Sequence, residues 1–220
     1  MLPWLPENVS TFGADIDWLF RVIFWITSIV FIGVQAALFW FIFKYRYDPN
    51  RRAVYTHGNN TLEIAWTIAP SLILMVLAVI SWGSWRHIKQ VMPPSNHPVR
   101  VMARQFGFEF TYPGPDGKFD TEDDKTFLDD LNVPVNQVIR LELKSKDVIH
   151  SFFVPQLRLK QDAMPGKKID AWFEATKPGT YEIPCAELCG FGHSGMRALL
   201  TVHSAESYAK WVQDKWPAGA

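Results

Sequence analysis

The protein has 220 residues, with 22 lysines and arginines balanced by 22 aspartates and glutamates, so its formal net charge is zero. A chain without a net positive field is not drawn to nucleic acid, and we expect no nucleic-acid partner. Hydrophobic residues form 48% of the sequence, and two long apolar runs in the first half indicate contact with membrane lipid.

Two runs without a charged side chain, residues 22–43 and 64–85, are the first predicted elements. As helices, each would be about 33 Å long, enough to cross a hydrocarbon core of about 30 Å. The alternative is a pair of buried helices in a soluble protein. We predict transmembrane helices over residues 19–43 and 63–87. Pro70 lies in the second, where a membrane helix tolerates it.

The segment between these runs, residues 44–62, is basic, whereas the first twenty residues contain no lysine or arginine. The positive-inside rule therefore places this loop in the cytoplasm and the N-terminal segment, residues 1–18, outside. Arg86, His87 and Lys89 follow the second run and oppose this orientation. The sequence predicts a multi-pass protein of the cell (inner) membrane whose C-terminal part lies on the outer, periplasmic side.

The second half of the chain is typical of an all-β domain. After a proline-rich linker over residues 88–98, apolar side chains recur at alternate positions, which is the period of half-buried strands. Pro-Gly and Asp-Gly turns separate these strands at the short intervals of an antiparallel sandwich or barrel. We predict this domain over residues 99–205, followed by a C-terminal helix and tail over residues 206–220.

An acidic loop lies within this domain, over residues 116–130, and contains seven aspartates and glutamates. A solvated hairpin tip is the first interpretation, because charge runs are usually exposed. A docking patch for a basic partner is the second. A calcium site is the third, since the spacing does not follow the EF-hand order.

The segment CAELCGFGHSGM, residues 185–196, contains both cysteines of the chain, a histidine and a methionine. A disulfide in an oxidising compartment would explain the cysteines but not His193 and Met196. Zinc accepts thiolates and imidazole, whereas a thioether favours copper. A mononuclear blue-copper site uses one cysteine, so the second cysteine suggests two bridged copper ions. That arrangement needs another histidine, and His150 is a candidate.

The sequence resembles subunit II of haem-copper oxygen reductases. The two apolar runs and the segments DVIHSF, DAMPGK, WFEATKPGTY and CAELCGFGHSGM carry the resemblance, which extends from about Leu19 to about His203. It implies a two-helix transmembrane hairpin followed by an all-β, cupredoxin-like domain with a dinuclear copper A centre. The ligands it implies are His150, Cys185, Glu187 through its backbone carbonyl, Cys189, His193 and Met196.

The resemblance also implies partners and further site residues. The side chain of Glu187 would bind a magnesium ion shared with subunit I, and Glu63 would stand near the mouth of a proton pathway. Subunit III and an electron donor, a cytochrome c or another haem protein, would complete the assembly. Many family members have a tryptophan where electrons enter. This chain has Phe106 and Phe108 in that stretch, which are therefore the candidates for that role.

The implied function is an electron relay in a proton-translocating cytochrome c oxidase. The copper pair would accept electrons from the donor and pass them to haem in subunit I, where oxygen is reduced to water. Phe152, Phe191 and Trp172 are expected to keep water from the metals. Alternatives are the same subunit of a nitric oxide reductase, a membrane-tethered copper carrier, a copper chaperone, and a structural domain stapled by a disulfide.

Overall fold

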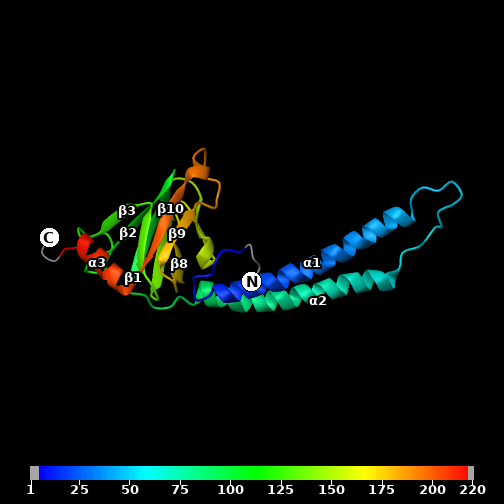
Figure 1. Ribbon diagram of the computed structural model, residues 1–220, viewed down its shortest axis with the longest axis horizontal. Coiled ribbons are helices and arrows are strands. Elements are labelled where there is room, and N and C mark those ends of the chain that lie inside the picture. Colours follow the sequence, from blue (N-terminus) through cyan, green and yellow to red (C-terminus); the bar gives the residue numbers. More distant parts are fainter. Residues whose placement is uncertain (1–4, 218–220) are drawn as a thin grey trace. The chain divides into compact units, whose positions relative to one another are not determined.

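A computed structural model describes residues 5–217, which fall into two compact units. The first unit comprises residues 15–86. The second joins the N-terminal segment to the chain from residue 87 onward. Figure 1 shows that the first unit is helical and that the second is built mainly of strands.

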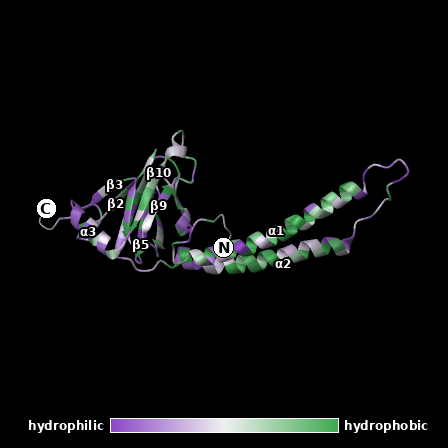
Figure 2. Ribbon diagram, viewed as in Figure 1, coloured by the Kyte–Doolittle hydropathy of each residue, from purple (hydrophilic) through white to green (hydrophobic). Residues whose placement is uncertain are grey.

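The helical unit consists of two long helices, α1 (Gly13–Lys44) and α2 (Asn60–Trp85), which are long and apolar enough to span a membrane. Figure 2 shows hydrophobic residues along both helices and a hydrophilic connection between them. Both helices begin before the expected residues 19 and 63. A 32-residue helix is about 48 Å long, so α1 is longer than the hydrocarbon core requires.

The start of α2 is fixed by a side-chain cap. The Asn59 side chain accepts a hydrogen bond from the Leu62 amide at 3.1 Å. Glu63 lies in the first turn, where a negative charge is favoured by the helix dipole. Pro70 lies inside α2, which continues to Trp85 without interruption.

The second unit contains three sheets, which confirms the predicted β fold (Figure 1). The five-stranded sheet has the order β3 (Lys125–Leu128), β2 (Gly107–Tyr112), β1 (His97–Arg104), β5 (Val138–Ser145) and β8 (Ile169–Glu174). The three-stranded sheet has the order β4 (Asp130–Pro134), β10 (Arg197–His203) and β9 (Gly179–Pro184). A hairpin of β6 (His150–Val154) and β7 (Leu159–Ala163) forms the third. The last helix is α3 (Ala205–Lys215).

Two strand pairs correct the expectation of an antiparallel domain. Strand β1 pairs with β5 in parallel, with Val101 opposite Leu143, and β4 pairs with β10 in parallel, with Leu131 opposite Leu200. Turn residues mark where a strand ends but carry no information on its neighbour in the sheet. Parallel pairing needs a long connection, and the sequence could not reveal which connections cross over.

The alternating apolar residues of the strands form the core. Buried side chains come from both larger sheets, for example Val101, Leu141 and Phe173 from one and Leu131 and Leu200 from the other. Fully burying each of these side chains contributes about 1.5–3 kcal/mol of transfer free energy. The core therefore supports the loops at the end of the domain where β1, β5 and β9 finish.

The N-terminal segment before α1 is part of the β domain, which the sequence did not indicate. Ser10 forms a bridge with Ala175, and the Thr176 amide donates to the Val9 carbonyl at 2.8 Å. Val9 and Phe12 are 1% and 2% exposed. Within the outer segment predicted over residues 1–18, the described residues thus contribute one β-bridge and two core side chains.

The segment that follows α2 is also tied to this domain. It continues as a π-helical turn, Arg86–Gln90, which takes up the first three residues of the linker predicted over residues 88–98. The Trp172 indole donates to the Ile88 carbonyl at 2.8 Å, and Lys89 Nζ donates to Gln161 Oε1 at 2.6 Å. These bonds fix where the chain enters the domain.

An ion cluster centred on Glu142 lies on β1 and β5. Its carboxylate accepts from Lys144 Nζ at 2.7 Å, Lys168 Nζ at 2.5 Å and Arg100 Nε at 3.2 Å. Burial of Glu142 opposes its ionisation, but the two lysines outweigh that effect and lower its pKa from 4.5 to about 2. The cluster therefore favours the ionised carboxylate in the folded protein.

Replacing Glu142 by glutamine is expected to lower the free energy of unfolding by about 1–3 kcal/mol at pH 7, after allowance for screening by solvent. A depressed pKa stabilises the fold above the unfolded pKa, and this contribution is lost as the pH falls from 4.5 towards 2. Urea unfolding at several pH values measures both effects. Glu182→Gln, in an exposed pair with Arg197, is the control and should cost little. Equal losses for the two variants would contradict the role of the cluster.

Candidate metal centre

The predicted metal ligands come from two segments that meet at one end of the β domain. His150 is the first residue of β6, and Cys185 directly follows β9. The remaining candidates lie in the loop that joins β9 to β10 and in its short 3-10 turn, His193–Gly195. Sequence positions 35 residues apart are therefore brought together by the ends of two strands.

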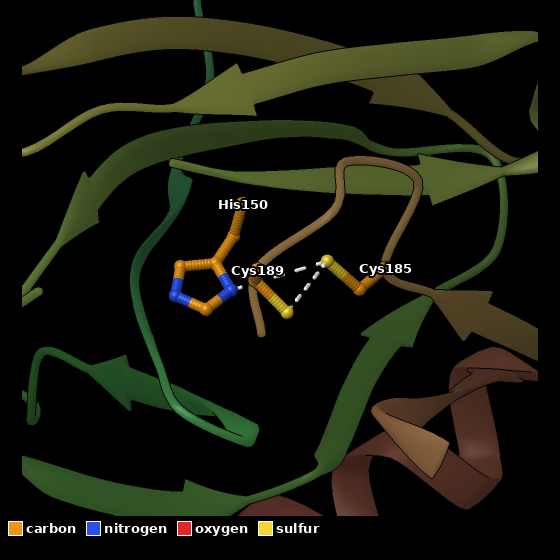
Figure 3. Close-up of side chains that lie close together, drawn as sticks. All are labelled: His150, Cys185 and Cys189. Carbon is orange, nitrogen blue, oxygen red and sulfur yellow. Dashed lines mark hydrogen bonds between the residues drawn. The ribbon is translucent and has the colours of Figure 1, made fainter. Parts of the chain in front are cut away.

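The two thiols and His150 form the centre of the site (Figure 3). The two sulfur atoms lie 3.9 Å apart, and Cys185 Sγ lies 3.9 Å from His150 Nδ1. His150, Cys185 and Cys189 are 0%, 7% and 3% exposed. Both cysteines are free thiols, which rules out the predicted alternative of a disulfide staple in this structure. Two sulfurs at this separation can bind the same metal ion, since metal–sulfur bonds are about 2.3 Å long.

The other three candidates surround the thiols. His193 Nδ1 lies 3.5 Å from Cys189 Sγ, and Met196 Sδ lies 3.7 Å from the same sulfur. The Glu187 carbonyl oxygen lies 3.2 Å from Cys185 Sγ. Each sulfur thus has one imidazole beside it. This donor set of thiol, imidazole and thioether fits copper better than zinc or calcium.

Backbone hydrogen bonds hold the loop in this conformation. The Cys185 amide donates to the Met196 carbonyl at 3.0 Å, which closes the base of the loop. The Ala186 amide donates to the Ser151 carbonyl at 3.1 Å, and Cys185 forms an isolated bridge with Phe152. The loop is therefore fastened both to β10 and to the strand that carries His150.

The environment of the thiols disfavours a bare thiolate. Burial and the neighbouring Cys185 raise the pKa of the Cys189 thiol from 9.0 to about 11. A thiolate here needs a nearby positive charge, and a bound metal ion provides one. The buried pair is therefore suited to binding a cation and poorly suited to acting as free nucleophiles.

Asp147 is a site residue that the sequence analysis missed. Its Oδ1 lies 2.8 Å from His150 Nε2, and its Oδ2 accepts from the Gln105 amide at 2.7 Å. Burial opposes ionisation of Asp147, but hydrogen bonds from Gln105, His150 and Val148 hold its pKa below the usual value. A carboxylate on Nε2 leaves Nδ1 facing the thiols. A carboxylate three residues before a candidate histidine is the signal that could have revealed it.

Replacing Asp147 by alanine is expected to weaken metal binding by about 10–100-fold, because the partner that orients the ring of His150 is lost. A competition titration of the full chain with a copper chelator measures the affinity. Asp147→Asn retains an acceptor for the ring and should recover part of the loss. Asp170→Ala, at an exposed pair with Arg140, is the control. Wild-type affinity in Asp147→Ala would overturn this positioning role.

The two phenylalanines predicted to receive electrons lie in different surroundings. Phe106 is 42% exposed in the turn between β1 and β2, and its ring packs over Gly190 and Gly192. A Cβ atom on Gly192 would lie 2.6 Å from this ring, so the close approach requires glycine. Phe108 is fully buried in the core. The prediction for Phe108 is therefore wrong as a contact with a donor, because no partner can reach its ring.

The residues expected to shield the metals are also corrected in part. Phe152 is fully buried beside Cys185, as predicted. Phe191 is fully exposed at the tip of the loop and excludes no water. Trp172 packs edge-on against Phe12, and its indole donates to the Ile88 carbonyl. These contacts lie with the N-terminal segment and with the turn after α2, not with the ligands. Their positions in the sequence did not show which of these three aromatic residues would lie buried beside the ligands.

Two aspartates of the acidic loop, Asp120 and Asp129, have local partners. Asp120 forms a bidentate pair with Arg100, and Asp129 Oδ1 accepts from the Phe108 amide at 2.7 Å. Its tip lies at the far end of the β2–β3 hairpin from Phe106. At about 3.3 Å per residue, the six-residue strand β2 separates them by about 17–20 Å. The tip therefore does not adjoin the candidate ligands.

Comparison with known proteins gives matches along most of the chain. The family model "Cytochrome C oxidase subunit II, transmembrane domain" matches residues 4–83, and the model "Cytochrome C oxidase subunit II, periplasmic domain" matches residues 119–203. An alternative cytochrome c oxidase subunit 2 from Bradyrhizobium diazoefficiens is 29% identical, over 97% of this chain and 84% of the relative. A probable cytochrome c oxidase subunit 2 from Rickettsia bellii is 32% identical, over 97% and 85%.

A solved structure is similar to the β domain. The crystal structure of the periplasmic domain of subunit II of cytochrome oxidase from Bradyrhizobium japonicum is 30% identical to this chain, with a TM-score of 0.50. The match covers 57% of this chain and 96% of that structure. The likeness is therefore confined to the β domain.

Proposed function

Because the chain belongs to the cytochrome c oxidase subunit II family, we propose that its β domain holds two copper ions as a copper A centre. The proposed ligands are His150, Cys185, Glu187 through its carbonyl, Cys189, His193 and Met196. The observation that carries this proposal is the buried thiol pair, 3.9 Å apart, with one imidazole beside each sulfur. Two thiolates that bridge two metal ions account for both cysteines of the chain.

The protein is the electron-accepting subunit of a membrane-bound oxidase, and its second unit lies on the outer side of the membrane. When bound, the copper pair supplies a one-electron redox centre between the donor and haem in subunit I. The residues of this chain keep the centre rigid. Backbone bonds close the loop on β10, Asp147 orients His150, and Phe152 packs beside Cys185, so little rearrangement is needed when an electron arrives.

The alternatives are less compatible with these observations. A copper chaperone needs accessible ligands, whereas four of the six proposed ligands are buried. The relatives reported above are oxidase subunits, which favours oxygen over nitric oxide as the final acceptor and favours a catalytic partner over a free carrier. An oxidase subunit is therefore the function that the site supports best.

The proposal is tested by loading the full chain with copper in lipid nanodiscs and recording its EPR spectrum. One electron shared equally by two copper nuclei should give a seven-line hyperfine pattern. Metal analysis should give two copper ions per chain. A four-line pattern, or one copper ion per chain, would replace the dinuclear centre with a mononuclear one.

We further propose that Glu187 serves a second metal through its side chain. The residue lies between the two cysteines, and its side chain is exposed while its carbonyl faces Cys185. An exposed carboxylate is free to bind magnesium shared with subunit I. In the assembled oxidase, Glu187→Gln should lose the EPR signal of manganese substituted for magnesium and keep that of copper. Retention of the manganese signal would contradict this role.

The remaining proposals concern the membrane-spanning half of the chain. Glu63 stands in the first turn of α2, at the cytoplasmic end that the basic loop predicts, and is proposed to lie near a proton pathway in subunit I. We also propose that subunit III is a further partner and that the protein lies in the cell (inner) membrane. Glu63→Gln in the assembled oxidase should slow proton uptake and leave the copper spectrum unchanged. An unchanged uptake rate would remove Glu63 from the pathway.

For the electron donor, a cytochrome c or another haem protein, we propose docking on an apolar surface beside the copper ligands. This surface consists of exposed side chains from three neighbouring loops, namely Phe106, Val148, Ile149, Leu188 and Phe191. The loops are joined by the bonds from Gln105 to Asp147 and to the Cys189 carbonyl. Exposed apolar patches of this kind mark interaction sites. The acidic tip, about 17–20 Å away, is not needed for this contact.

Replacing Phe106 by alanine is expected to lower the second-order rate of electron transfer from the donor, because a contact ring next to the ligand loop is lost. Stopped-flow reduction of the assembled oxidase measures this rate. It should change by less than about twofold between 50 and 200 mM salt, since apolar docking is weakly screened. Leu199→Ala, an exposed residue on β10, is the control. A steep fall with salt would favour docking on the acidic loop.

A further inference from the structure

A cavity lies in the β domain, away from the metal ligands. It has a volume of about 650 Å³ and is enclosed by the start of β1, the turn after β2, strand β4 and helix α3. Aromatic and proline side chains form much of its wall, among them Tyr112, Tyr208, Trp216, Pro98 and Pro113. Small-molecule sites usually have volumes of about 300–1,000 Å³ and walls of this kind.

The cavity contains polar groups that have no partner within the described residues 5–217. Asn132 is 5% exposed, and its Nδ2 forms no hydrogen bond. The Tyr208 hydroxyl and the ring nitrogens of His97 likewise have no hydrogen-bond partner in that part of the chain, although their rings meet edge to face at 5.8 Å. Buried polar groups normally have partners, so the Asn132 amide is a structural exception. Tyr208 and His97 are half-buried, so their unpaired groups are open to a ligand in the cavity.

The orientation of the Asn132 amide is fixed by its neighbours. His203 Nδ1 lies 2.8 Å from Ser207 Oγ, and His203 Nε2 lies 2.7 Å from Asn132 Oδ1. If the serine donates to Nδ1, the ring donates from Nε2 and the amide oxygen accepts. The Nδ2 donor of Asn132 then has no partner, but it is fully buried behind the wall and not exposed to the cavity. By contrast, the Tyr112 hydroxyl is used twice by the backbone of Asn132.

The wall of the cavity is electrically neutral. None of its described lining residues is lysine, arginine, aspartate or glutamate. Burial raises the pKa of Tyr208 to about 12 and lowers the pKa of His97, so both side chains are uncharged at neutral pH. An ionised ligand would lose its hydration without gaining a counter-ion, which is costly. The cavity therefore selects an uncharged ligand.

We propose that this cavity binds a small, uncharged aromatic molecule that carries a carbonyl or hydroxyl oxygen. Its ring lies against the aromatic and proline wall, and its oxygen bonds to the half-buried Tyr208 and His97. The proposal does not depend on the copper centre, because no proposed metal ligand lines the cavity.

The test uses the full chain in lipid nanodiscs, with methyl NMR signals of isoleucine as the reporter. Ile139 lines the cavity, whereas Ile183 is buried elsewhere in the core and serves as the internal control. The probe is 4-hydroxyacetophenone, and its charged counterpart is 4-hydroxybenzoate. We expect the neutral probe to shift the Ile139 signal in a saturable way, and the carboxylate to bind at least about tenfold more weakly.

A pair of tyrosine variants tests the polar contacts. Tyr208→Phe removes a hydroxyl that has no partner in the fold, so it should keep the protein stable and weaken binding about fivefold. Tyr181→Phe removes a hydroxyl that bonds to Lys177 outside the cavity and should bind the probe normally. The proposal is overturned if the Ile139 signal does not saturate, if both probes bind equally, or if Tyr208→Phe binds like the unmodified chain. Occupancy by water alone would give the first of these results.

Discussion

Replacing Cys185 by serine is expected to abolish the seven-line EPR pattern of the copper-loaded chain. A bridge needs a soft, deprotonated donor that two copper ions can share, and a serine hydroxyl is neither soft nor readily deprotonated. The sulfur atoms of Cys185 and Cys189 lie 3.9 Å apart, and in the proposed centre both bridge the two copper ions. Replacing one of them leaves a single bridging atom. The remaining donors can then hold one copper ion with a four-line pattern, or none.

Met196→Leu is the matched variant for this experiment. The thioether lies 3.7 Å from Cys189 Sγ at the side of the thiol pair, where it can act as a weak axial ligand. The variant should keep both copper ions and the seven-line pattern while its reduction potential shifts. EPR and a redox titration separate the two roles. A seven-line pattern that survives in Cys185→Ser would disprove the bridging assignment, whatever happens to Met196.

Replacing Phe12 by alanine is expected to lower the free energy of unfolding of the β domain by about 3–5 kcal/mol, the usual cost of deleting a buried phenylalanine ring. Phe12 is 2% exposed and packs edge-on against Trp172 at a centroid distance of 5.2 Å. The variant would leave a cavity beside Trp172, in the segment that the bridge between Ser10 and Ala175 holds on the domain. The urea dependence of protease resistance in the full chain measures the loss.

Phe191→Ala makes the same chemical change at a fully exposed position and is the control. It should cost less than about 0.5 kcal/mol, as most surface substitutions do. A Phe12→Ala variant that loses no more stability than Phe191→Ala would show that the N-terminal segment does not contribute to the core. Hydrogen exchange of the Thr176 amide, which donates to the Val9 carbonyl, independently measures how stably the same segment is held.

The sequence predicted which kind of metal the candidate site accepts, but not how its residues are arranged. The residue types in the segment 185–196 restrict the metal to one that accepts thiolate, imidazole and thioether, because donor softness is a property of the side chains themselves. Asp147 gave only the signal of its spacing, three residues before His150, and Gln105 gave none, since aspartate and glutamine are common on surfaces. Their roles follow from the 2.8 Å and 2.5 Å contacts to His150 and the Cys189 carbonyl, which exist only in the folded chain.

The sequence by itself determined the secondary-structure elements that form through interactions between neighbouring residues. Uncharged runs of 22 residues predict two membrane-spanning helices, and alternation of apolar side chains predicts half-buried strands, because both depend only on neighbouring residues. Tertiary structure decided which strands pair in parallel, that Val9 and Phe12 belong to the core, and that Phe106 faces solvent while Phe108 is buried. Both phenylalanines follow the same alternating pattern in the sequence. The chain turns at residues 105–106, however, and a turn changes which side chains face the core.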